Sequence, residues 1–436
     1  MSDTSNQRTL SRVLGLTDVL ASGVGIIVGA GIYVLLGPAT EKAGGLVWLA
    51  FVLSAMVCGL TAMSYAELSS IFPRAGGEYE YARHAMSRHG AFMVGWTMMA
   101  GLIVAAATVA LGFARYFTYF WSIESRLVAI GLLCGVSAVV MLGIRRSTWV
   151  VVALSTIQIG GLVFVIAVGL DHIGDVNLLA GSGGSWFSSA RGVAGSVALV
   201  FFAFIGFDEV TTLSEETRDP TRTTPRALLG ALALSTVLYV LVSMTSVSVL
   251  GPETLAASEQ PLRDVAATAL GDRAGAVMAI LAMITTANTV LLIITAASRM
   301  AFAMARQADL PERLAELDGR GTPVVASVVA VVGAVGFVTA GRFELVANAT
   351  DVAVYATFLF VNYIVVRLRF GEPDRKRPFR VPGAIGRLPV IPVLAFVVTV
   401  WMVVLLDWRA IVIGLTIMLV GLVVSYLRSG VVRLVR

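Results

Sequence analysis

The chain has 436 residues, of which 57% are hydrophobic and only 14% are charged, and its formal net charge is +5. Soluble domains rarely contain more than half apolar residues, so this composition excludes an ordinary soluble enzyme and indicates an integral membrane protein. The positive charges lie in short loops between apolar runs, a pattern that indicates membrane topology and no nucleic-acid partner. Cys58 and Cys134 both fall in apolar runs and are expected to be packing residues.

The polar segment at the start of the chain lacks the basic-then-apolar order of a cleaved signal peptide, so the first apolar run is expected to remain as a helix. Twelve apolar runs are each long enough to cross a bilayer core of about 30 Å. They predict an all-α integral membrane protein with twelve transmembrane helices at residues 16–37, 45–71, 90–117, 126–143, 148–170, 191–213, 227–250, 274–305, 323–340, 347–366, 389–406 and 409–427. The loops between these spans are too short to hold a catalytic domain.

Positive charge is distributed unequally between the two families of loops. About three quarters of the 32 lysines and arginines lie in the terminal segments and in the loops after even-numbered spans. Because loops rich in lysine and arginine stay in the cytoplasm, both termini are predicted to be cytoplasmic. The expected location is the inner (plasma) membrane.

The first and sixth spans differ from the others because each contains a point where a helix can unwind. The first span has four glycines in the nine residues 23–31, and the sixth has an aromatic run interrupted by Gly206 just before two acids. Each glycine costs a helix about 1 kcal/mol relative to alanine. Paired glycine-interrupted spans mark the central site of transporters built from inverted repeats. Here they open two five-helix blocks, so an inverted repeat is expected from hydropathy and position.

An unwound helix exposes backbone groups that suit a zwitterion. The half-helix beginning near Ala30 presents unpaired N–H groups and the positive end of its dipole, which suit a carboxylate. Carbonyl groups released near Ile27 and Ile205 suit an ammonium group. The alternative is that Gly29 and Gly31 only permit close helix packing. The matching break in the sixth span favours a binding site.

Three sequence segments carry a resemblance to a known family. They are GIIVGAGIYVLLGPA, which starts at Gly25, YAELSSIFPRAGGEYEYAR from Tyr65 to Arg83, and FFAFIGFDEVTTLSEETRDPTRTTPRAL from Phe201 to Leu228. With weaker matches further along, the chain from about residue 15 to 383 resembles the amino acid–polyamine–organocation (APC) permeases. The sixth-span segment is most similar to the cationic amino acid transporter branch.

The resemblance implies the leucine-transporter-type fold, a five-plus-five inverted repeat followed by two C-terminal helices. The expected division is a cytoplasmic N-terminal segment 1–15, a first repeat 16–170, a second repeat 191–366, two C-terminal helices 389–427 and a cytoplasmic tail 428–436. It also implies a substrate site made of Ile27, Val28, Gly29, Ala30, Gly31, Phe202, Ala203, Phe204, Ile205 and, in the eighth span, Ile293. Phe202 matches the aromatic gate residue that covers the substrate from the periplasmic side.

The coupling ion is left open by the sequence. Proton-coupled relatives often carry a lysine in the fifth helix, whereas this chain has Gln158 at the equivalent position, and glutamine cannot titrate. Thr295 and Ser298 could offer hydroxyl oxygens to sodium beside the carbonyl groups of Gly25 and Val28. Hydroxyl groups in membrane helices more often bond back to their own helix, which disfavours a sodium site.

Five acidic residues lie in or near apolar spans, where an ionised group is costly and therefore suspected of a function: Asp18, Glu67, Asp208, Glu209 and Asp351. Asp18 and Glu67 lie near predicted cytoplasmic ends, where an interfacial ion pair is the simpler interpretation. Asp208 and Glu209 directly follow the sixth-span break. A gating or structural ion pair, with Arg299 as a candidate partner, is favoured there over proton carriage.

The predicted function is a secondary-active permease that moves a small amino acid by alternating access. Spans 3 and 8 offer mainly small and apolar side chains over 97–108 and 284–294, which favours a neutral substrate. A cationic amino acid or a polyamine is the alternative, and an amino acid sensor on the same fold is a more remote one. No enzyme, metal site or cofactor is expected, since the three histidines fall in loops and no H-E-x-x-H motif occurs. An ion channel or proton pump would show ionisable residues along several span centres, and that pattern is missing.

Overall fold

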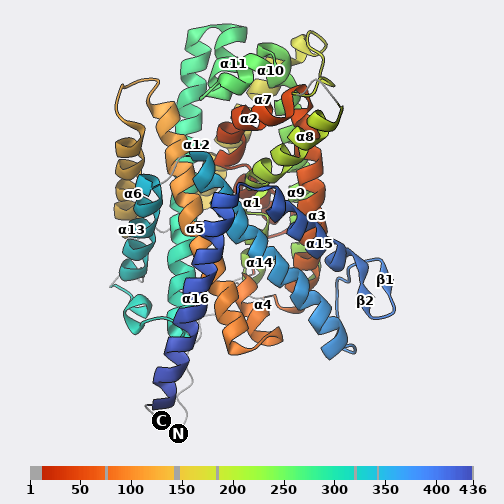
Figure 1. Cartoon of the computed structure of the whole chain (residues 1–436), viewed down its shortest axis with the longest axis vertical. Helices are drawn as coiled ribbons and strands as arrows, with labels where there is room; N and C mark the ends of the chain where they lie inside the picture. Colours follow the sequence, from red (N-terminus) through yellow and green to blue (C-terminus); the bar gives the residue numbers. More distant parts are fainter. Residues whose placement is uncertain are drawn as a thin grey trace.

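The computed structural model describes residues 12–73, 77–141, 148–182, 186–318, 322–340 and 343–434. Over these residues the long helices run side by side along the long axis of the molecule (Figure 1). Helices α10 (Pro252–Ala257) and α11 (Pro261–Leu270) cap one end of this bundle, and α4 (Gly77–Ala85) lies at the opposite end. We call these two ends the α11 face and the α4 face.

The helices follow one another with short connections. The first half of the chain contains α1 (Leu16–Ile27), α2 (Ala30–Ala43), η1 (Gly44–Leu46), α3 (Val47–Ile71), α4, α5 (Arg88–Phe117), α6 (Ser125–Met141), α7 (Thr148–Gly169) and η2 (Leu170–His172). The second half contains α8 (Trp186–Val200), η3 (Phe201–Phe204), η4 (Asp208–Glu215), α9 (Pro220–Leu250), α10, α11, α12 (Asp272–Arg306), η5 (Glu312–Ala315), α13 (Val324–Ala340) and α14 (Phe343–Gly371). The last helices are α15 (Val390–Leu405) and α16 (Trp408–Leu434).

Local sequence explains where several of these helices begin and end. Helices α9, α10 and α11 each begin with a proline, which lacks an N–H that the first turn would leave unpaired anyway. Helices α9 and α11 end at Gly251 and Gly271, whose φ angles of 76° and 86° lie in the left-handed region that glycine favours. Proline therefore marks the start of each of these three helices, and glycine marks where α9 and α11 end.

Apolar character supports a multi-pass membrane protein. Eight helical stretches of the described residues are long and apolar enough to cross a membrane: Ala30–Ile71, Arg88–Phe117, Leu154–His172, Trp186–Glu215, Pro220–Leu250, Asp272–Arg306, Phe343–Gly371 and Trp408–Arg428. The first of them joins two predicted spans through the 3₁₀ turn η1. Helices α1, α6, α13 and α15 are apolar but shorter. The multi-pass character is thus confirmed, whereas the count of twelve spans stays a prediction.

The structure also contains a small hairpin that an all-helical prediction did not include. Strands β1 (Ala384–Ile385) and β2 (Leu388–Pro389) pair antiparallel just before α15. Gly386 opens the two-residue turn between them with φ +62°, a conformation favoured by glycine. The hairpin projects from the α4 half of the bundle (Figure 1).

Glycines also permit the close helix contacts of the bundle. A Cβ atom at Gly112 of α5 would lie only 2.6 Å from Cγ2 of Val34 in α2, nearer than side-chain carbons approach one another. Small residues at such positions let membrane helices pack backbone against side chain. The packing of α5 against α12 and α14 and of α3 against α9 completes the interior that surrounds the site.

Candidate substrate site at two helix breaks

The first span is interrupted at the glycines singled out in its sequence. Helix α1 ends at Ile27 and α2 begins at Ala30. Between them, Val28 has ψ 70° and Gly29 has φ −103° and ψ −152°, so neither continues the helix. The first N–H groups of α2 have no carbonyl group one turn earlier in the same helix. This break therefore presents the N-terminal end of a helix in the interior of the bundle.

The sixth span is interrupted in a corresponding way. Helix α8 passes into the 3₁₀ turn η3, and the chain then leaves the helical conformation at Ile205, where ψ is 137°. Gly206 follows with φ +109°, which side chains rarely tolerate, and η4 resumes at Asp208. A Cβ atom at Gly206 would also lie 3.0 Å from Cγ2 of Ile26, so this glycine lets the second break lie against the first span.

The two breaks touch one another. A Cβ atom at Gly31 would lie 2.4 Å from the Cα atom of Ala203, which is a backbone atom and cannot rotate away. The hydroxyl group of Tyr239 in α9 donates to the carbonyl oxygen of Ile27 at 2.7 Å and to that of Ala203 at 2.9 Å. A single hydroxyl proton is thus shared between carbonyl groups from both breaks. Ile27 and Ala203, predicted to face the substrate, do lie together, and Tyr239 joins them.

Helix α12 supplies a further wall at the first break. A Cβ atom at Gly29 would lie 3.2 Å from Oγ1 of Thr289. One turn away, Thr285 is completely buried, and its hydroxyl group has no hydrogen-bond partner among the described residues. The predicted contact Ile293 is half-buried and lies one turn beyond Thr289 on the same helix. The prediction that this span offers mainly apolar side chains is incomplete, because threonines lie on this side of it.

The aromatic run of the sixth span packs into the core around the break. Phe202, the predicted gate residue, is only 7% exposed. The ring of Phe204 lies edge-on to Tyr239 with centroids 5.2 Å apart. The ring of Phe201 lies 4.4 Å from that of Tyr355 in α14. These contacts hold η3 between α9 and α14, so the break occupies a defined place.

The ends of the two broken spans are linked at the α4 face. The N–H groups of Val13 and Leu14 donate to the carbonyl oxygen of Glu216 at 2.9 and 3.0 Å, and Arg218 N–H donates to Leu14 at 2.8 Å. Leu14 and Thr217 form an isolated parallel bridge. The segment before α1 is therefore joined to the segment after η4 by backbone hydrogen bonds.

Residues 14–426 match the family model described as amino acid permease, which is nearly the whole chain. The chain belongs to the amino acid permease family. The permease is 29% identical to the branched-chain amino acid permease BcaP of Bacillus subtilis (strain 168), covering 98% of this chain and 95% of that protein. It is also 29% identical to the vacuolar cationic amino acid transporter 2 of Arabidopsis thaliana, covering 85% of this chain and 62% of that protein.

A solved structure supports the fold assignment. The manganese transporter of Eremococcus coleocola, in complex with an aromatic bis-isothiourea substituted compound, superposes with a TM-score of 0.59. The superposition covers 99% of both chains at 14% sequence identity. At this identity the likeness concerns the fold alone.

The acidic residues after the second break have a different partner from the predicted one. Asp208 is 4% exposed, and its Oδ1 atom accepts a hydrogen bond from the N–H of Gly206 at 3.1 Å. Glu78 of α4 is its neighbour, since α4 packs against η4. Arg299 lies on the exposed side of α12, so the prediction that it pairs with Asp208 gains no support from the described residues. Glu209 is half-buried.

The candidate sodium ligands bond to their own helix. The hydroxyl group of Thr295 donates to Leu291 at 2.6 Å, and that of Ser298 donates to the carbonyl group of Thr295 at 2.9 Å. Gly25 faces α7, where a Cβ atom would lie 2.2 Å from Oγ of Ser155. A sodium site at these residues is therefore not favoured by the geometry.

Gln158 of α7 connects to the first broken span through its backbone. Its carbonyl oxygen accepts a hydrogen bond from the hydroxyl group of Tyr33 in α2 at 2.9 Å. The side chain is 1% exposed, and its amide oxygen has no hydrogen-bond partner in the described part of the chain. The position carries no charge, in agreement with the absence of a titrating lysine there.

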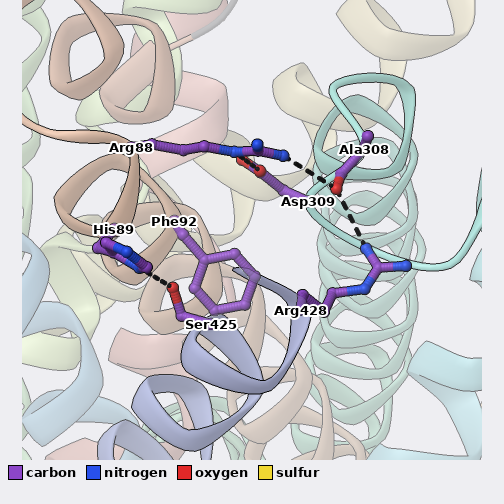
Figure 2. Close-up of a pocket in the computed structure, with 7 residues that line it drawn as sticks. All are labelled: Arg88, His89, Phe92, Ala308, Asp309, Ser425 and Arg428. Atoms are coloured by element: carbon purple, nitrogen blue, oxygen red, sulfur yellow. Dashed lines mark hydrogen bonds and ion pairs between the residues drawn. The ribbon is translucent and has the colours of Figure 1, made fainter. Parts of the chain in front are cut away.

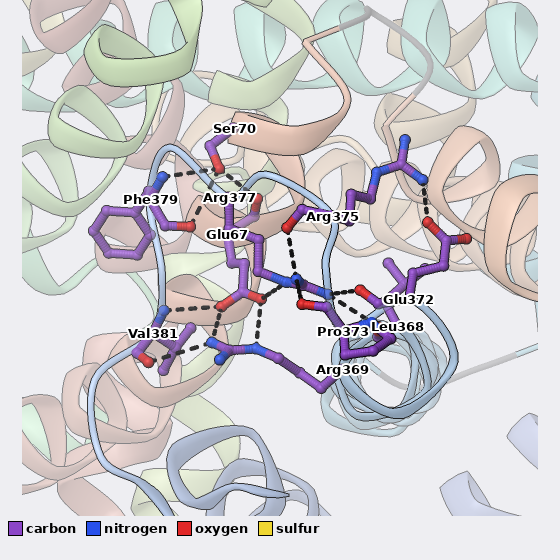
Figure 3. A network of polar contacts seen from close by, with 10 residues as sticks. All are labelled: Glu67, Ser70, Leu368, Arg369, Glu372, Pro373, Arg375, Arg377, Phe379 and Val381. Carbon is purple, nitrogen blue, oxygen red and sulfur yellow. Dashed lines mark hydrogen bonds and ion pairs between the residues drawn. The ribbon is translucent and has the colours of Figure 1, made fainter. Parts of the chain in front are cut away.

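A buried ion pair closes the α4 face around Glu67 (Figure 3). The carboxylate of Glu67 accepts two hydrogen bonds from Arg369, at 2.9 and 2.5 Å, and its Oε1 lies 3.3 Å from Nε of Arg377. The N–H of Val381 donates to Oε2 at 2.8 Å. Glu67 and Arg369 are only 1% and 3% exposed. The expected ion pair of Glu67 is thus present, and it fixes the loop after α14 to α3.

A pocket on the same face is separate from the two breaks (Figure 2). Arg88 of α5 pairs with Asp309 at 3.0 Å and also donates to the carbonyl oxygen of Ala308 at 3.2 Å. Arg428 of α16 donates to the same carbonyl oxygen at 3.3 Å. None of the predicted substrate-site residues lines this pocket. Its arginines hold α5, α16 and the loop after α12 together.

Proposed function

We propose that the permease moves a small neutral amino acid across the membrane by alternating access. The observation that carries this proposal is the contact between the two helix breaks, where Tyr239 bridges carbonyl groups of Ile27 and Ala203. When the substrate enters, its ammonium group would bind these carbonyl oxygens and its carboxylate would bind the first N–H groups of α2. The Bacillus subtilis relative, a branched-chain amino acid permease, supports a branched-chain substrate.

Architecture and topology belong to the same proposal. The chain has twelve spans if α1 and α2 together form one span and α8, η3 and η4 together form another. These spans divide into two repeats, 16–170 and 191–366, and two C-terminal helices over 389–427. The α4 face is taken to be cytoplasmic, because Arg88, Arg369 and Arg428 lie there with both ends of the described chain. The proposed membrane is the inner (plasma) membrane, with the segments 1–15 and 428–436 in the cytoplasm.

The structure suggests how access would alternate. The backbone link between the segment before α1 and the segment after η4 makes these half-spans move as one unit. Rotation of that unit would open the breaks toward the α4 face, while Phe202 would close them toward the α11 face. In the present structure both breaks are in contact, which corresponds to a closed arrangement.

The test is uptake by purified permease in proteoliposomes, with radiolabelled L-leucine, L-arginine and spermidine presented separately. The expected result is saturable leucine uptake that unlabelled valine and isoleucine reduce, with little arginine or spermidine uptake. A thermal-shift measurement provides an independent check, since a ligand that binds only the folded state raises its apparent stability. Binding without any uptake would instead favour an amino acid sensor.

One observation favours a cationic amino acid as a second candidate. Asp351 of α14 is completely buried, and neither of its carboxylate oxygens has a partner among the described residues. It lies one turn before Tyr355, whose ring packs on Phe201 of the second break. A cationic side chain would supply the missing partner. If arginine is the substrate, Asp351→Asn should abolish arginine uptake; if leucine is, the variant should leave leucine uptake nearly unchanged.

A further inference from the structure

Helix α4 carries an acidic side chain into the protein interior. The helix begins at Gly77, whose φ of +51° turns the chain inward, and Glu78 follows directly. Glu78 is 4% exposed, and its Oε1 atom accepts a hydrogen bond from the hydroxyl group of Tyr65 in α3 at 2.8 Å. Burying a carboxyl group at this depth is costly unless it is paired or protonated.

Asp208 meets Glu78 from the other side. It follows the second helix break, is equally buried, and is held by the N–H of Gly206. Helix α4 packs against η4, and the two acidic side chains lie close enough for the charge of Asp208 to act on Glu78. Two neighbouring buried carboxyl groups repel each other when both are ionised, and a proton kept by one of them removes that repulsion. Within the described residues, no ion pair includes Glu78 or Asp208.

The described residues around this pair supply no ion-paired cation. Tyr81 of α4 is completely buried close to both carboxyl groups, and its hydroxyl group has no partner in the described part of the chain. The other helices that pack against α4 are α5 and α14. Their arginines at this face are engaged elsewhere, Arg88 with Asp309 and Arg369 with Glu67.

We propose that Glu78 and Asp208 together form a proton-binding site that couples transport to proton movement. One proton is shared between the two carboxyl groups while the α4 face is closed. When η4 moves with α1 to open that face, the carboxyl groups separate and become hydrated. The O–H bond then breaks, water accepts the proton, and two carboxylates remain. This inference rests on the proposed transport function and adds the coupling ion to it.

The acidity of Glu78 suits this role. Burial and the neighbouring charge of Asp208 raise the pKa of Glu78 from 4.5 to about 8. The pair therefore holds its proton near neutral pH while it is buried. Hydration removes the burial that raises the pKa, so the proton is released once the face opens. Retention of the proton while the α4 face is closed, and its release when that face opens, tie proton movement to the conformational change of transport.

The experiment compares exchange with net coupled transport in proteoliposomes that contain a pH-sensitive dye. L-Leucine and L-arginine serve as probes with the wild type, Glu78→Gln, Asp208→Asn and the control Glu80→Gln, which lies two residues along α4. Wild type and control should accumulate substrate under an inward proton gradient and acidify the lumen. Glu78→Gln resembles the protonated acid, so it should retain exchange at equal pH but lose at least tenfold in gradient-driven accumulation and show no acidification.

Each outcome decides between the two proposals. If the wild type exchanges neither probe, the proposed function fails first. If it transports a probe without acidification, or if Glu78→Gln still acidifies the lumen like the wild type, the proton site is refuted while the transport function stands. Should Glu78→Gln not fold, the Kd of the transported probe is measured on the wild type between pH 6 and 9. A Kd that weakens several-fold as pH rises through 8 supports the site, and a constant Kd overturns it.

Discussion

Replacement of Gly31 is the most direct test of the contact between the breaks. The Cβ atom of Gly31→Ala would lie 2.4 Å from the Cα and 2.8 Å from the Cβ of Ala203. Carbon atoms in contact are normally about 3.5–4.0 Å apart, so roughly 1 Å of separation between α2 and η3 is needed. The obstructing atom belongs to the backbone, and the strain therefore displaces a whole break and not one side chain.

The energetic effect on folding is small compared with the effect on transport. Overpacking of this kind costs about 1–3 kcal/mol. Replacing glycine with alanine in a helix stabilises the folded state by about 1 kcal/mol, which offsets part of this cost, so the variant should still fold. When groups that must be held in a precise geometry are displaced by about 1 Å, the rate of the process they support can fall about 100-fold. We expect leucine uptake to fall at least tenfold in Gly31→Ala and to disappear in Gly31→Val.

The matched control is Gly131 of α6, where an added Cβ atom meets nothing within 4 Å. Gly131→Ala and Gly131→Val should leave uptake unchanged. Initial uptake rates are compared at equal reconstituted protein, after size-exclusion chromatography has shown that each variant is monodisperse. Normal uptake by well-folded Gly31→Val would refute the assignment of the substrate site to the two breaks.

Three further predictions concern stability. Tyr239→Phe leaves two buried carbonyl groups without their donor and should lower the free energy of unfolding by about 1–3 kcal/mol. The loss should exceed that of Tyr355→Phe, which removes one long hydrogen bond of 3.2 Å, and denaturation of the purified variants checks this order. Glu67→Gln removes the carboxylate from a buried cluster of arginines and should lower the free energy of unfolding by about 3–5 kcal/mol. Glu372→Gln breaks a more exposed pair and should lower it by only about 0–1 kcal/mol. Equal losses of stability in the two variants would contradict the importance of burial. Because the pKa of Glu78 is raised to about 8 in the folded protein, protonation of Glu78 stabilises the fold fully below pH 4.5, and this stabilisation is lost as pH rises through 8. The melting temperature measured across that pH range should therefore fall less steeply in Glu78→Gln than in the wild type.

Several features of the permease could be predicted from local sequence. Long apolar runs indicate membrane helices whatever their neighbours are, because the bilayer and not a tertiary contact supplies the apolar environment. Glycines marked both helix breaks: a cluster lies at the first break, and at the second Gly206 adopts a positive φ that other residues resist. The identity of the aromatic run before Gly206 likewise placed Phe202 and Phe204 beside the second break.

The residues that join the breaks were not predicted. Tyr239 and Thr289 lie in spans whose sequences look ordinary, and their roles appear only when α9 and α12 pack against the breaks. A signal for Thr289 existed, because it and Thr285 are polar residues one turn apart in the middle of an apolar span. Nothing in the sequence of α9 distinguished Tyr239 from the other buried tyrosines.

The partner of Asp208 shows the limit of sequence reasoning most clearly. Asp208 was recognised as suspect because an acid in an apolar span is costly, and Arg299 was the candidate partner. The structure places it beside Glu78, which is 130 positions earlier and belongs to a polar segment where an acid raises no suspicion. The sequence alone determined that this is a multi-pass membrane protein with two interrupted helices, since hydropathy and glycine conformation act locally. Only the tertiary structure decided which side chains meet at the breaks and that Glu78 and Asp208 lie together, because those contacts depend on how distant helices pack.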